Sequence, residues 1–330
     1  MKVAINGLGR IGRLVLRNAL DLGLNVVAIN DLTDPKTLAY LVKYDSVHGK
    51  LKDNVEFGTD FIKVGGKKIQ IISEKDPEKL PWKKLGVDIV VESTGFFTDK
   101  EGAMKHIKAG AKKVVISAPA KNPDATIVLG VNDEAIKKEQ QILSMASCTT
   151  NCLAPVAKVL EENFGIKKGF MTTVHAYTSS QKIVDGPDKK LRRGRAGALN
   201  IVPTTSGATK AVIEVIPKLA GKMDGLAMRV PVPSGSIVDF VADLERPPKD
   251  KNAVNEAFKK AAAGKMKGIL DYTEDEIVSS DIIGDTHSSI VDGLSTMLIG
   301  DTVKVLSWYD NEYGYYHRLA EFVKKLGHFL

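Results

Sequence analysis

Three closely spaced glycines near the start of the chain constrain the fold more than any other feature. Gly7, Gly9 and Gly12 have G-x-G-x-x-G spacing and directly follow the apolar run KVAIN. The next segment, residues 10–23, places apolar side chains at helical spacing, and a second apolar run, NVVAIN, comes after it. The pattern therefore predicts a strand, a tight turn, a helix and a second strand, which together open an α/β domain.

Asp31 adds a ligand to this prediction. It follows the second apolar run and lies 19 residues after Gly12, about where a dinucleotide-binding unit carries its ribose-binding carboxylate. In such a unit Gly7 permits the tight turn, Gly9 lets the backbone approach a pyrophosphate, and Gly12 lets the helix pack closely on the strand. A carboxylate accepts hydrogen bonds from ribose hydroxyls and repels a 2′-phosphate, so we expect NAD rather than NADP. The alternative is an α/β turn that binds no ligand.

The remainder of the first half continues to alternate between strands and helices. We expect a hairpin at residues 61–72, a helix at 100–110 with Thr98 and Glu101 as its capping box, and buried strands at 87–93, 112–119 and 125–130. This alternation predicts a mainly parallel sheet covered by helices on both faces, in a Rossmann-type doubly wound α/β domain. Ligands bind such sheets beyond the carboxyl ends of the strands. Thr94, Gly95 and Ser117 are therefore candidate cofactor contacts, although ordinary turn chemistry also explains them.

The two cysteines of the chain, Cys148 and Cys152, lie in the stretch SMASCTTNCLAP. Residues 141–147 are strand-like and residues 149–165 are helix-like, so Cys148 falls at the junction. The start of a helix favours a thiolate, and its free N–H groups can stabilise an oxyanion formed by attack on a carbonyl. We therefore interpret Cys148 as a nucleophile.

Cys152 is expected one helical turn further along. Side chains four apart on a helix have Cβ atoms about 5–6 Å apart, whereas a disulfide needs about 3.8 Å. A zinc site lacks further ligands, because neither a second cysteine pair nor a close histidine cluster accompanies the two thiols. We expect no metal, and we interpret Cys152 as an inert core thiol.

A thiol nucleophile needs a base, and the chain has six histidines. His175 is the attractive candidate because residues 169–178 are strand-like and can project it from a sheet towards the helix start. Spacing alone does not exclude any of the other five histidines as the base.

Cationic side chains suggest an anionic substrate. Residues 178–204 form a long polar, basic segment with little periodicity, and segments of this kind are usually functional. Its Arg192, Arg193 and Arg195 can bind phosphate or carboxylate. Residues 204–210 open another helix. Arg229 lies within an apolar strand and needs an anionic partner, either a protein carboxylate or a substrate.

Size and composition limit the class of protein. A chain of 330 residues favours two domains. The net charge of +7 is spread along the chain, which argues against a dedicated nucleic-acid site and suits anionic metabolites. No apolar run approaches membrane-spanning length, and the first residues lack a signal peptide's apolar core. We therefore expect a cytoplasmic protein with no membrane association.

Motifs along the whole chain resemble those of the phosphorylating glyceraldehyde-3-phosphate dehydrogenases of glycolysis. The segments that carry the resemblance are INGLGRIGR, NDLTDPKTLAYLVKYDSVHG, ESTGFFT, SAPAK, SCTTNCLAP, HAYTSSQKIVDGP, LRRGRAGALNIVPT, SGATKAV, RVPVPSGSIVDF and WYDNEYGY. The cysteine motif is highly specific to that family. Small departures remain, such as Ser206 in place of a common threonine and TSSQ in place of the TNDQ frequent in bacterial members, and neither removes a mechanistic group.

The resemblance implies a reaction and roles for the matched residues. D-glyceraldehyde 3-phosphate would be oxidised with NAD and inorganic phosphate to 1,3-bisphosphoglycerate in glycolysis and gluconeogenesis, through a thiohemiacetal and a thioester on Cys148. His175 would be the base. The cofactor would be held by Gly9, Arg10, Ile11, Asp31 and Ser117, with Asn311 on the nicotinamide amide. The substrate phosphate and inorganic phosphate would be held by Ser147, Thr149, Thr178, Arg193, Ser206, Gly207 and Arg229.

The resemblance also implies an architecture. We expect an NAD-binding domain at residues 1–147, a catalytic α+β domain with a mixed or antiparallel sheet at 148–310, and a C-terminal helix at about 311–330 that returns to the first domain. The family forms homotetramers. Two other functions stay open: erythrose-4-phosphate dehydrogenase, a relative with the same nucleophile, and a non-enzymatic RNA-binding protein, which would not need Cys148 together with His175.

Overall fold

The computed structural model describes residues 1–330, which divide into two compact units. The first unit comprises Met1–Ile127, Glu134–Ala146 and Tyr316–Leu330, and the second comprises Val128–Asp133 and Ser147–Tyr315. The expected domains, 1–147 and 148–310 with a returning C-terminal helix, differ from these units mainly at Val128–Asp133. This segment belongs to the second unit because Val128 and Val131 are buried in its hydrophobic core.

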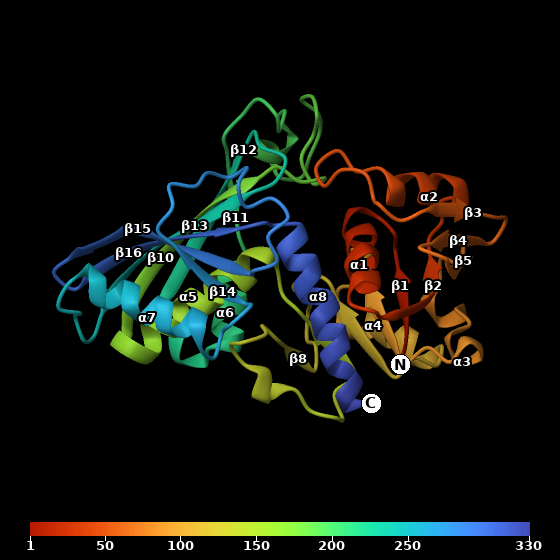
Figure 1. Ribbon diagram of the computed structural model, residues 1–330, viewed down its shortest axis with the longest axis horizontal. Coiled ribbons are helices and arrows are strands. Elements are labelled where there is room, and N and C mark those ends of the chain that lie inside the picture. Colours follow the sequence, from red (N-terminus) through yellow and green to blue (C-terminus); the bar gives the residue numbers. More distant parts are fainter. The chain divides into compact units, whose positions relative to one another are not determined.

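The first unit is built on a nine-stranded sheet of mixed direction, in the order β3-β4-β5-β2-β1-β6-β7-β9-β8 (Figure 1). Its strands are β1 (Lys2–Asn6), β2 (Asn25–Asn30), β3 (Val55–Phe57), β4 (Phe61–Val64), β5 (Lys67–Ile72), β6 (Ile89–Glu92), β7 (Lys113–Ile116), β8 (Ala125–Thr126) and β9 (Ile142–Ser144). The pairs from β5 through β8 are parallel, while β3, β4 and β5 pair antiparallel at one edge. The predicted Rossmann-type fold is confirmed, with an antiparallel extension.

Both faces of this sheet are covered. The helices of the unit are α1 (Arg10–Asp21), α2 (Pro35–Lys43), α3 (Trp82–Leu85), α4 (Lys100–Lys108) and most of α8 (Tyr313–Leu326). On one face Ala4 of β1 and Val90 of β6 share a hydrophobic cluster with Trp82 and Ala103. The alternate side chain Ile5 is buried as well, as expected when apolar runs fill a parallel sheet.

Two local predictions for the first unit were wrong. The cap of α4 is Asp99, whose carboxylate accepts a hydrogen bond from the Gly102 N–H at 2.6 Å, because the helix begins at Lys100. Thr98 lies one residue too early to cap it. The strand expected at 125–130 is the two-residue β8, because the chain then enters the core of the second unit at Val128.

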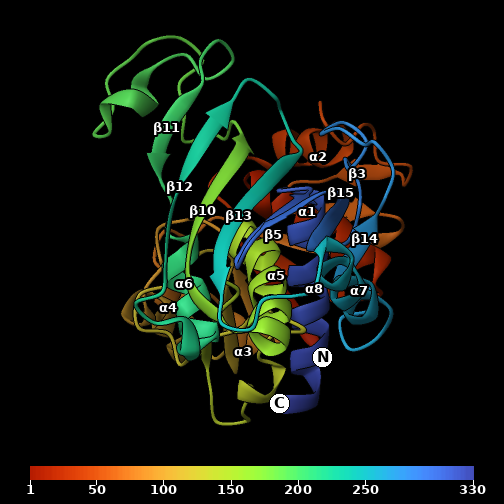
Figure 2. The same ribbon diagram turned by 90° about the vertical axis from the view of Figure 1, so that its left-hand side faces the viewer.

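The second unit has a seven-stranded mixed sheet in the order β11-β12-β10-β13-β16-β15-β14. The strands are β10 (Ile166–Ala176), β11 (Val202–Thr205), β12 (Met223–Val230), β13 (Ser236–Leu244), β14 (Leu270–Thr273), β15 (Ser289–Ile299) and β16 (Thr302–Tyr309). Only the β10–β12 and β14–β15 pairs are parallel. This arrangement confirms the expected second domain with a mixed sheet, and Figure 2 shows β11, β12, β10 and β13 side by side.

Three helices cover one face of this second sheet: α5 (Cys148–Phe164), α6 (Ala208–Val215) and α7 (Lys251–Ala263). Alternate residues of β13, such as Phe240 and Leu244, share a core with Leu153 of α5, Val212 of α6 and Phe258 of α7. Because all three helices pack on the same alternate positions, they lie on one side, as Figure 2 also shows. No helix in either unit is long and apolar enough to cross a membrane.

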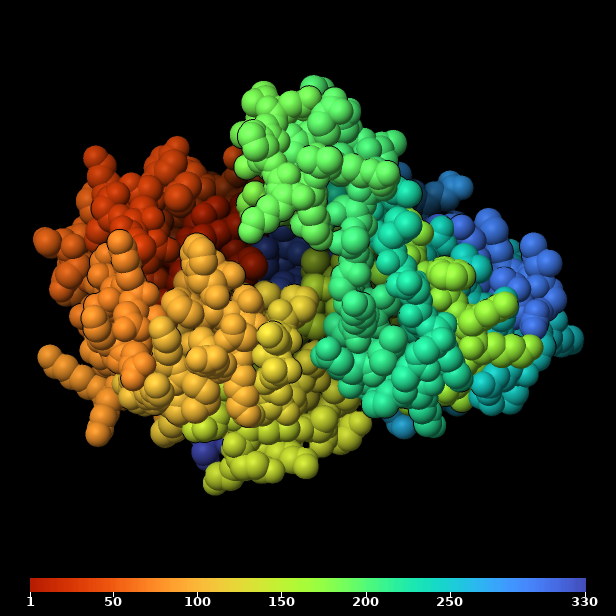
Figure 3. All heavy atoms as spheres, turned by 180° about the vertical axis from the view of Figure 1, so that it is seen from behind, coloured from red at the N-terminus to blue at the C-terminus, as the bar shows by residue number.

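Residues 178–204 are less irregular than the sequence predicts. They contain a 3₁₀ helix, Leu191–Gly194, and run into β11. A backbone bridge between Lys182 and Ala196 and an ion pair between Arg195 and Asp185 tie the segment to itself. It stands out on the surface in Figure 3, where it is light green.

Candidate active site

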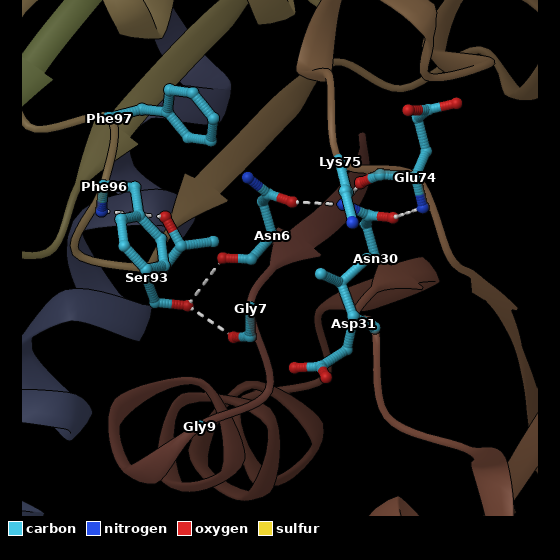
Figure 4. Close-up of a pocket in the computed structure, with 12 residues that line it drawn as sticks. Asn6, Gly7, Gly9, Asn30, Asp31, Glu74, Lys75, Ser93, Phe96 and Phe97 are labelled. Carbon is cyan, nitrogen blue, oxygen red and sulfur yellow. Dashed lines mark hydrogen bonds between the residues drawn. The ribbon is translucent and has the colours of Figure 1, made fainter.

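A cavity of about 540 Å³ opens at the carboxyl ends of β1, β2 and β6 in the first unit (Figure 4). It is lined by Asn6, Gly7, Gly9, Asn30, Asp31, Leu32, Glu74, Lys75, Ser93, Thr94, Phe96 and Phe97. Strand register explains the polar floor, because Asn6 lies beside Asn30 on one side and beside Glu92 on the other. The cavity therefore lies where a parallel sheet binds its ligand.

The three glycines occupy the positions that their spacing predicts. Gly7 has φ +90°, in the left-handed region. A Cβ on Gly12 would lie 2.0 Å from the Gly7 carbonyl oxygen, so the helix could not approach the turn with any larger residue. A Cβ on Gly9 would meet nothing within 4 Å, because this residue faces the cavity.

The start of α1 lacks a side-chain cap. Its N-cap is Gly9, and no side chain caps the helix. The first N–H groups of a helix carry partial positive charge and need acceptors. A pyrophosphate fits this cradle, since its oxygens would supply those acceptors.

Asp31 is held beside the glycine turn. One carboxylate oxygen accepts from the Leu8 N–H at 2.7 Å and the other from the Thr33 N–H at 2.9 Å. In Figure 4 the carboxylate turns towards the loop that carries Gly9. A ribose bound there would meet a fixed acceptor, which is the chemistry expected for NAD.

The other predicted cofactor residues fall into different places. Thr94 lines the cavity, and Gly95 follows it with φ +78°. Ser117 is buried and does not line the cavity, because its hydroxyl donates to the Glu92 carbonyl oxygen. Arg10 forms an ion pair with Asp45, and Ile11 is half-buried on α1.

The Asp45 carboxylate is strongly acidic. Burial alone would raise its pKa, but the N–H groups of His48 and Val47 and the Arg10 guanidinium lower the pKa of Asp45 to about 2. Arg10 is therefore anchored by a protein carboxylate that the sequence analysis did not anticipate.

The second group of predicted residues gathers at the start of α5. The helix begins at Cys148, and the Ser147 hydroxyl caps it by accepting from the Thr150 N–H at 3.1 Å. The Cys148 sulfur lies 3.5 Å from Nε2 of His175, the last residue but one of β10. The N–H groups of Cys148 and Thr149, at the start of the helix, lower the pKa of the thiol. Nucleophile, base and oxyanion donors therefore meet at one point.

Both members of this pair are neutral at neutral pH. Burial raises the pKa of the Cys148 thiol, and the Arg229 charge and the Thr149 hydrogen bonds offset this only partly. Burial, together with the Arg229 guanidinium, lowers the pKa of His175 to about 3. The sequence predicts a thiolate from the helix start alone, and it does not reveal that His175 is buried beside the half-buried Cys148.

The parallel pairing of β10 and β12 brings Arg229 to this pair. His175 and Arg229 are register partners, and the Arg229 Nη1 lies 2.8 Å from His175 Nδ1 and 3.0 Å from the Ala176 carbonyl oxygen. The same carbonyl lies 2.7 Å from His175 Nδ1. The Ala176 carbonyl can accept from both groups, and in the tautomer that carries its proton on Nδ1 the Nε2 atom is free to accept from the thiol, whereas a hydrogen bond from Arg229 to Nδ1 requires the other tautomer.

Arg229 has no carboxylate partner, although it is half-buried. Arg193 is also unpaired, and its Nε donates to the Thr204 hydroxyl at 2.9 Å on β11, the strand beside Arg229. Arg195, by contrast, pairs with Asp185, and Arg192 is exposed. Arg229, beside the catalytic pair, and Arg193 thus leave positive charge for an anion.

The other residues predicted to bind phosphate differ in the partners that they already have. Thr149 bonds to the Tyr309 hydroxyl at 2.9 Å, and Thr178 bonds to Ser180 at 2.8 Å. Gly207 is the N-cap of α6 without a side-chain cap, and Ser206 accepts from the Ala208 N–H. The structure thus places Thr149 beside the thiol and offers a second open helix start at α6.

Tyr309 is a site residue that the sequence analysis missed. Its buried ring packs edge-on against His175 with 5.9 Å between ring centroids, and its hydroxyl bonds to Thr149 and to Thr173 at 2.8 Å. It lies in the motif WYDNEYGY, where only Asn311 was considered. Asn311 is buried in the second unit, and its side-chain oxygen accepts from Ser236 at 2.7 Å.

Cys152 lacks the features that mark Cys148 as a nucleophile. Its sulfur is fully buried and lies 3.6 Å from the Ser307 carbonyl oxygen and 3.8 Å from the Ser289 hydroxyl. Burial raises the pKa of Cys152 to about 12. Both cysteines are free thiols, and no cluster of histidine, cysteine or acidic side chains is arranged to hold a metal ion.

Known proteins share this chain's sequence over its length. The family model for the glyceraldehyde 3-phosphate dehydrogenase NAD binding domain matches residues 1–100, and the model for the C-terminal domain of the same enzymes matches residues 147–311. The glyceraldehyde-3-phosphate dehydrogenase of Geobacillus stearothermophilus is 58% identical over 324 residues, covering 97% of this chain and 96% of that protein. The enzyme of Borreliella burgdorferi is 56% identical over 333 residues, covering 99% of each chain. The match to the Streptomyces coelicolor enzyme is 57% over 332 residues, with 99% and 98% covered. On this evidence the chain belongs to the glyceraldehyde-3-phosphate dehydrogenase family.

Proposed function

We propose that this protein oxidises and phosphorylates D-glyceraldehyde 3-phosphate to 1,3-bisphosphoglycerate, with NAD as its cofactor, in glycolysis and gluconeogenesis. One observation supports this most directly. A thiol lies 3.5 Å from a neutral imidazole, and the arginine beside them has no carboxylate partner. A nucleophile, a base and an uncompensated cation are what an aldehyde that carries a phosphate requires.

Cys148 and His175 perform the first step in this proposal. The sulfur attacks the aldehyde carbon while its proton passes to Nε2 of His175, which gives a thiohemiacetal. Nδ1 keeps its proton on the Ala176 carbonyl during this transfer. The N–H groups of Cys148 and Thr149 stabilise the oxygen that becomes negative.

The oxidation and the release of product complete the cycle. NAD, when bound, would supply the acceptor for the hydride of the substrate carbon. Cys148 then carries a thioester, which inorganic phosphate attacks; the carbon–sulfur bond breaks and an acyl phosphate leaves. The thioester preserves the free energy of oxidation because phosphate, rather than water, cleaves it.

We assign the binding roles as follows. Arg229 and Arg193 would neutralise the phosphate groups, helped by the open start of α6. The residues assigned to the two phosphate groups are Ser147, Thr149, Thr178, Arg193, Ser206, Gly207 and Arg229. The residues assigned to NAD are Gly7, Gly9, Arg10, Ile11, Gly12, Asp31, Thr94, Gly95, Ser117 and Asn311.

We further propose that the protein is a cytoplasmic homotetramer, as the family resemblance implies. Several exposed apolar side chains of the segment 178–204 support assembly. Ile183, Leu191 and Leu199 expose 88%, 85% and 82% of their surface, which is costly in a monomer.

The decisive assay follows NADH absorbance with glyceraldehyde 3-phosphate, NAD and inorganic phosphate. We expect sustained turnover that requires all three. Erythrose 4-phosphate should be the poorer substrate by kcat/KM. Faster turnover of erythrose 4-phosphate, or no turnover of either aldehyde, would contradict the proposal. The relatives described above are named glyceraldehyde-3-phosphate dehydrogenases. Nothing in the structure supports an RNA-binding function instead.

A further inference from the structure

A buried carboxylate lies directly behind the cavity of the first unit, and the proposed mechanism does not use it. Glu92, the last residue of β6, is 1% exposed and pairs with no lysine or arginine. Burying such a charge is costly unless hydrogen bonds compensate it. Glu92 must therefore be held by neutral donors.

Four donors converge on the two oxygens of Glu92. Oε1 accepts from the N–H and the hydroxyl of Thr94, and the N–H lies at 2.8 Å. Oε2 accepts from Nδ2 of Asn6 at 2.6 Å and lies 3.0 Å from Nε2 of His106. This is the surrounding of an ionised carboxylate, which accepts at both oxygens.

Trp82 fixes the tautomer of His106. The indole N–H can only donate, and it lies 3.0 Å from Nδ1 of His106. Nδ1 is therefore an acceptor, so the proton of the neutral ring is on Nε2, where it donates to Glu92. His106 is fully buried, which leaves it no water to replace either partner.

Three of the four donors belong to two residues that line the cavity, Asn6 and Thr94. The Asn6 amide is oriented at both ends, because its oxygen accepts from Asn30 Nδ2 at 2.7 Å while its Nδ2 donates to Glu92. Asn30 in turn accepts from the Glu74 N–H at 2.9 Å, as Figure 4 shows. The orientation of the cavity floor thus depends on Glu92.

We propose that Glu92 and His106 are positioning residues for the cofactor: with Trp82 they hold Asn6 and Thr94 in the orientation that binds the dinucleotide. This inference rests on the proposed NAD binding. A network that served packing alone would tolerate any residue of similar shape. A network that positions the floor requires a donor to Glu92 and an acceptor for Trp82.

Two substitutions at His106 separate these possibilities. His106→Gln keeps a donor for Glu92 and an acceptor for the indole, whereas His106→Leu fills the space without either. Glu92→Gln is the complementary change, because its NH₂ group must face donors whichever way the amide turns. Lys113→Met is the matched control, since this buried lysine bonds to the carbonyls of Lys138 and Gln140 and does not line the cavity.

The test is calorimetric titration of NAD into each full-length protein, with the thermal midpoint measured beside it. We expect Glu92→Gln and His106→Leu to raise the Kd by about tenfold or more, the size of a lost hydrogen bond to a charged group. His106→Gln should stay within about threefold of the natural protein. Lys113→Met should lower the midpoint and leave the Kd unchanged. In steady state the KM for NAD should rise while kcat at saturating NAD stays constant.

The results that overturn the inference are distinct from failure of the proposed function. If the natural protein binds NAD and His106→Leu binds it equally well, the positioning role is refuted while the proposed function stands. The His106 pair decides the question even if Glu92→Gln does not fold. If the natural protein does not bind NAD, both the proposed function and this inference fall.

Discussion

The starts of α1 and α6 differ from those of the other long helices of the two units. Asp34, Asp99 and Asp250 cap α2, α4 and α7 through their side chains. The N-caps of α1 and α6 are Gly9 and Gly207, and neither glycine supplies a side-chain cap. Where the protein supplies its own cap, the helix start is closed to ligands. Where a glycine stands, the N-cap side chain takes no donor, and although Ser206 accepts from the Ala208 N–H of α6, such a start can still offer N–H groups to phosphate oxygens.

The start of α5 combines both arrangements. Ser147 caps the Thr150 N–H, whereas the N–H groups of Cys148 and Thr149 act on the thiol and lower its pKa. The helix is therefore anchored by its own side chain and still offers donors to a reacting oxygen. Capping chemistry therefore distinguishes helix starts that stabilise the fold from helix starts that can bind a ligand.

The largest effect is expected at the start of α5, which combines a side-chain cap with available donors. Cys148→Ser should abolish turnover, since a hydroxyl next to a neutral imidazole is a far weaker nucleophile than the thiol. Iodoacetamide followed by peptide mapping should label Cys148 and leave the buried Cys152 unmodified. Full activity in Cys148→Ser, or preferential labelling of Cys152, would refute the interpretation that the start of α5 carries the nucleophile.

His175→Asn should lower kcat by about 10²–10⁴-fold, the usual contribution of a general base. Asparagine keeps hydrogen-bonding groups but cannot take the thiol proton. NAD affinity should be unchanged, because the cofactor cavity is lined entirely by residues of the first unit. Normal turnover in this variant would mean that another group accepts the proton.

Gly9→Asp tests the open start of α1 by giving it the cap that α2 and α4 possess. The new Cβ would meet nothing within 4 Å, so the fold should accept it. The carboxylate would take the donors and repel the pyrophosphate, and we expect the Kd for NAD to rise about tenfold or more. Thermal stability should be unchanged or slightly higher. Unchanged NAD affinity, measured by calorimetry, would refute the interpretation of α1.

The stability of the protein should depend on pH through His175. Its pKa is about 3 in the folded protein against an ordinary 6.5, so the unfolded chain binds the extra proton. The stabilisation is complete above pH 6.5 and is lost as pH falls towards 3. Between pH 7 and 5 the natural protein should lose about 2 kcal/mol more than His175→Asn in unfolding free energy. The unfolding free energy of both proteins is measured by urea unfolding at each pH. If it falls equally with pH in the two proteins, the low pKa of His175 is refuted.

The smallest effect is expected at a closed helix start. Asp99→Ala removes the cap of α4 and should cost about 1 kcal/mol of stability. NAD affinity and kcat should not change, since this cap lies outside both sites. A loss of NAD binding would show that closed caps also shape the cavity, which would weaken the comparison.

The sequence predicted those parts of the molecule that depend on local order. The glycine spacing predicted the βαβ unit, and the junction at Cys148 predicted a thiol at a helix start, because both follow from neighbouring residues. The cap at Asp99 was missed by one position, since the exact first residue of a helix is not encoded by its apolar pattern.

Contacts between distant segments could not be predicted in the same way. Three contacts each depend on how segments distant in the sequence pack together: the ion pair of Arg10 with Asp45, the ring of Tyr309 on His175, and the buried Glu92 with His106. The burial of His175 also comes from packing between distant segments, and desolvation shifts the pKa of Cys148 upwards, opposite to the effect of the helix start.

The most direct test of the catalytic site is a single turnover without phosphate. Enzyme at high concentration is mixed with glyceraldehyde 3-phosphate and NAD, and NADH is followed by its absorbance. We expect a burst of about one NADH per chain that then stops, with the acyl group on the peptide that contains Cys148 and its release when phosphate is added. A burst in Cys148→Ser, or an acyl group on any other residue, would contradict the assignment of Cys148 as the nucleophile.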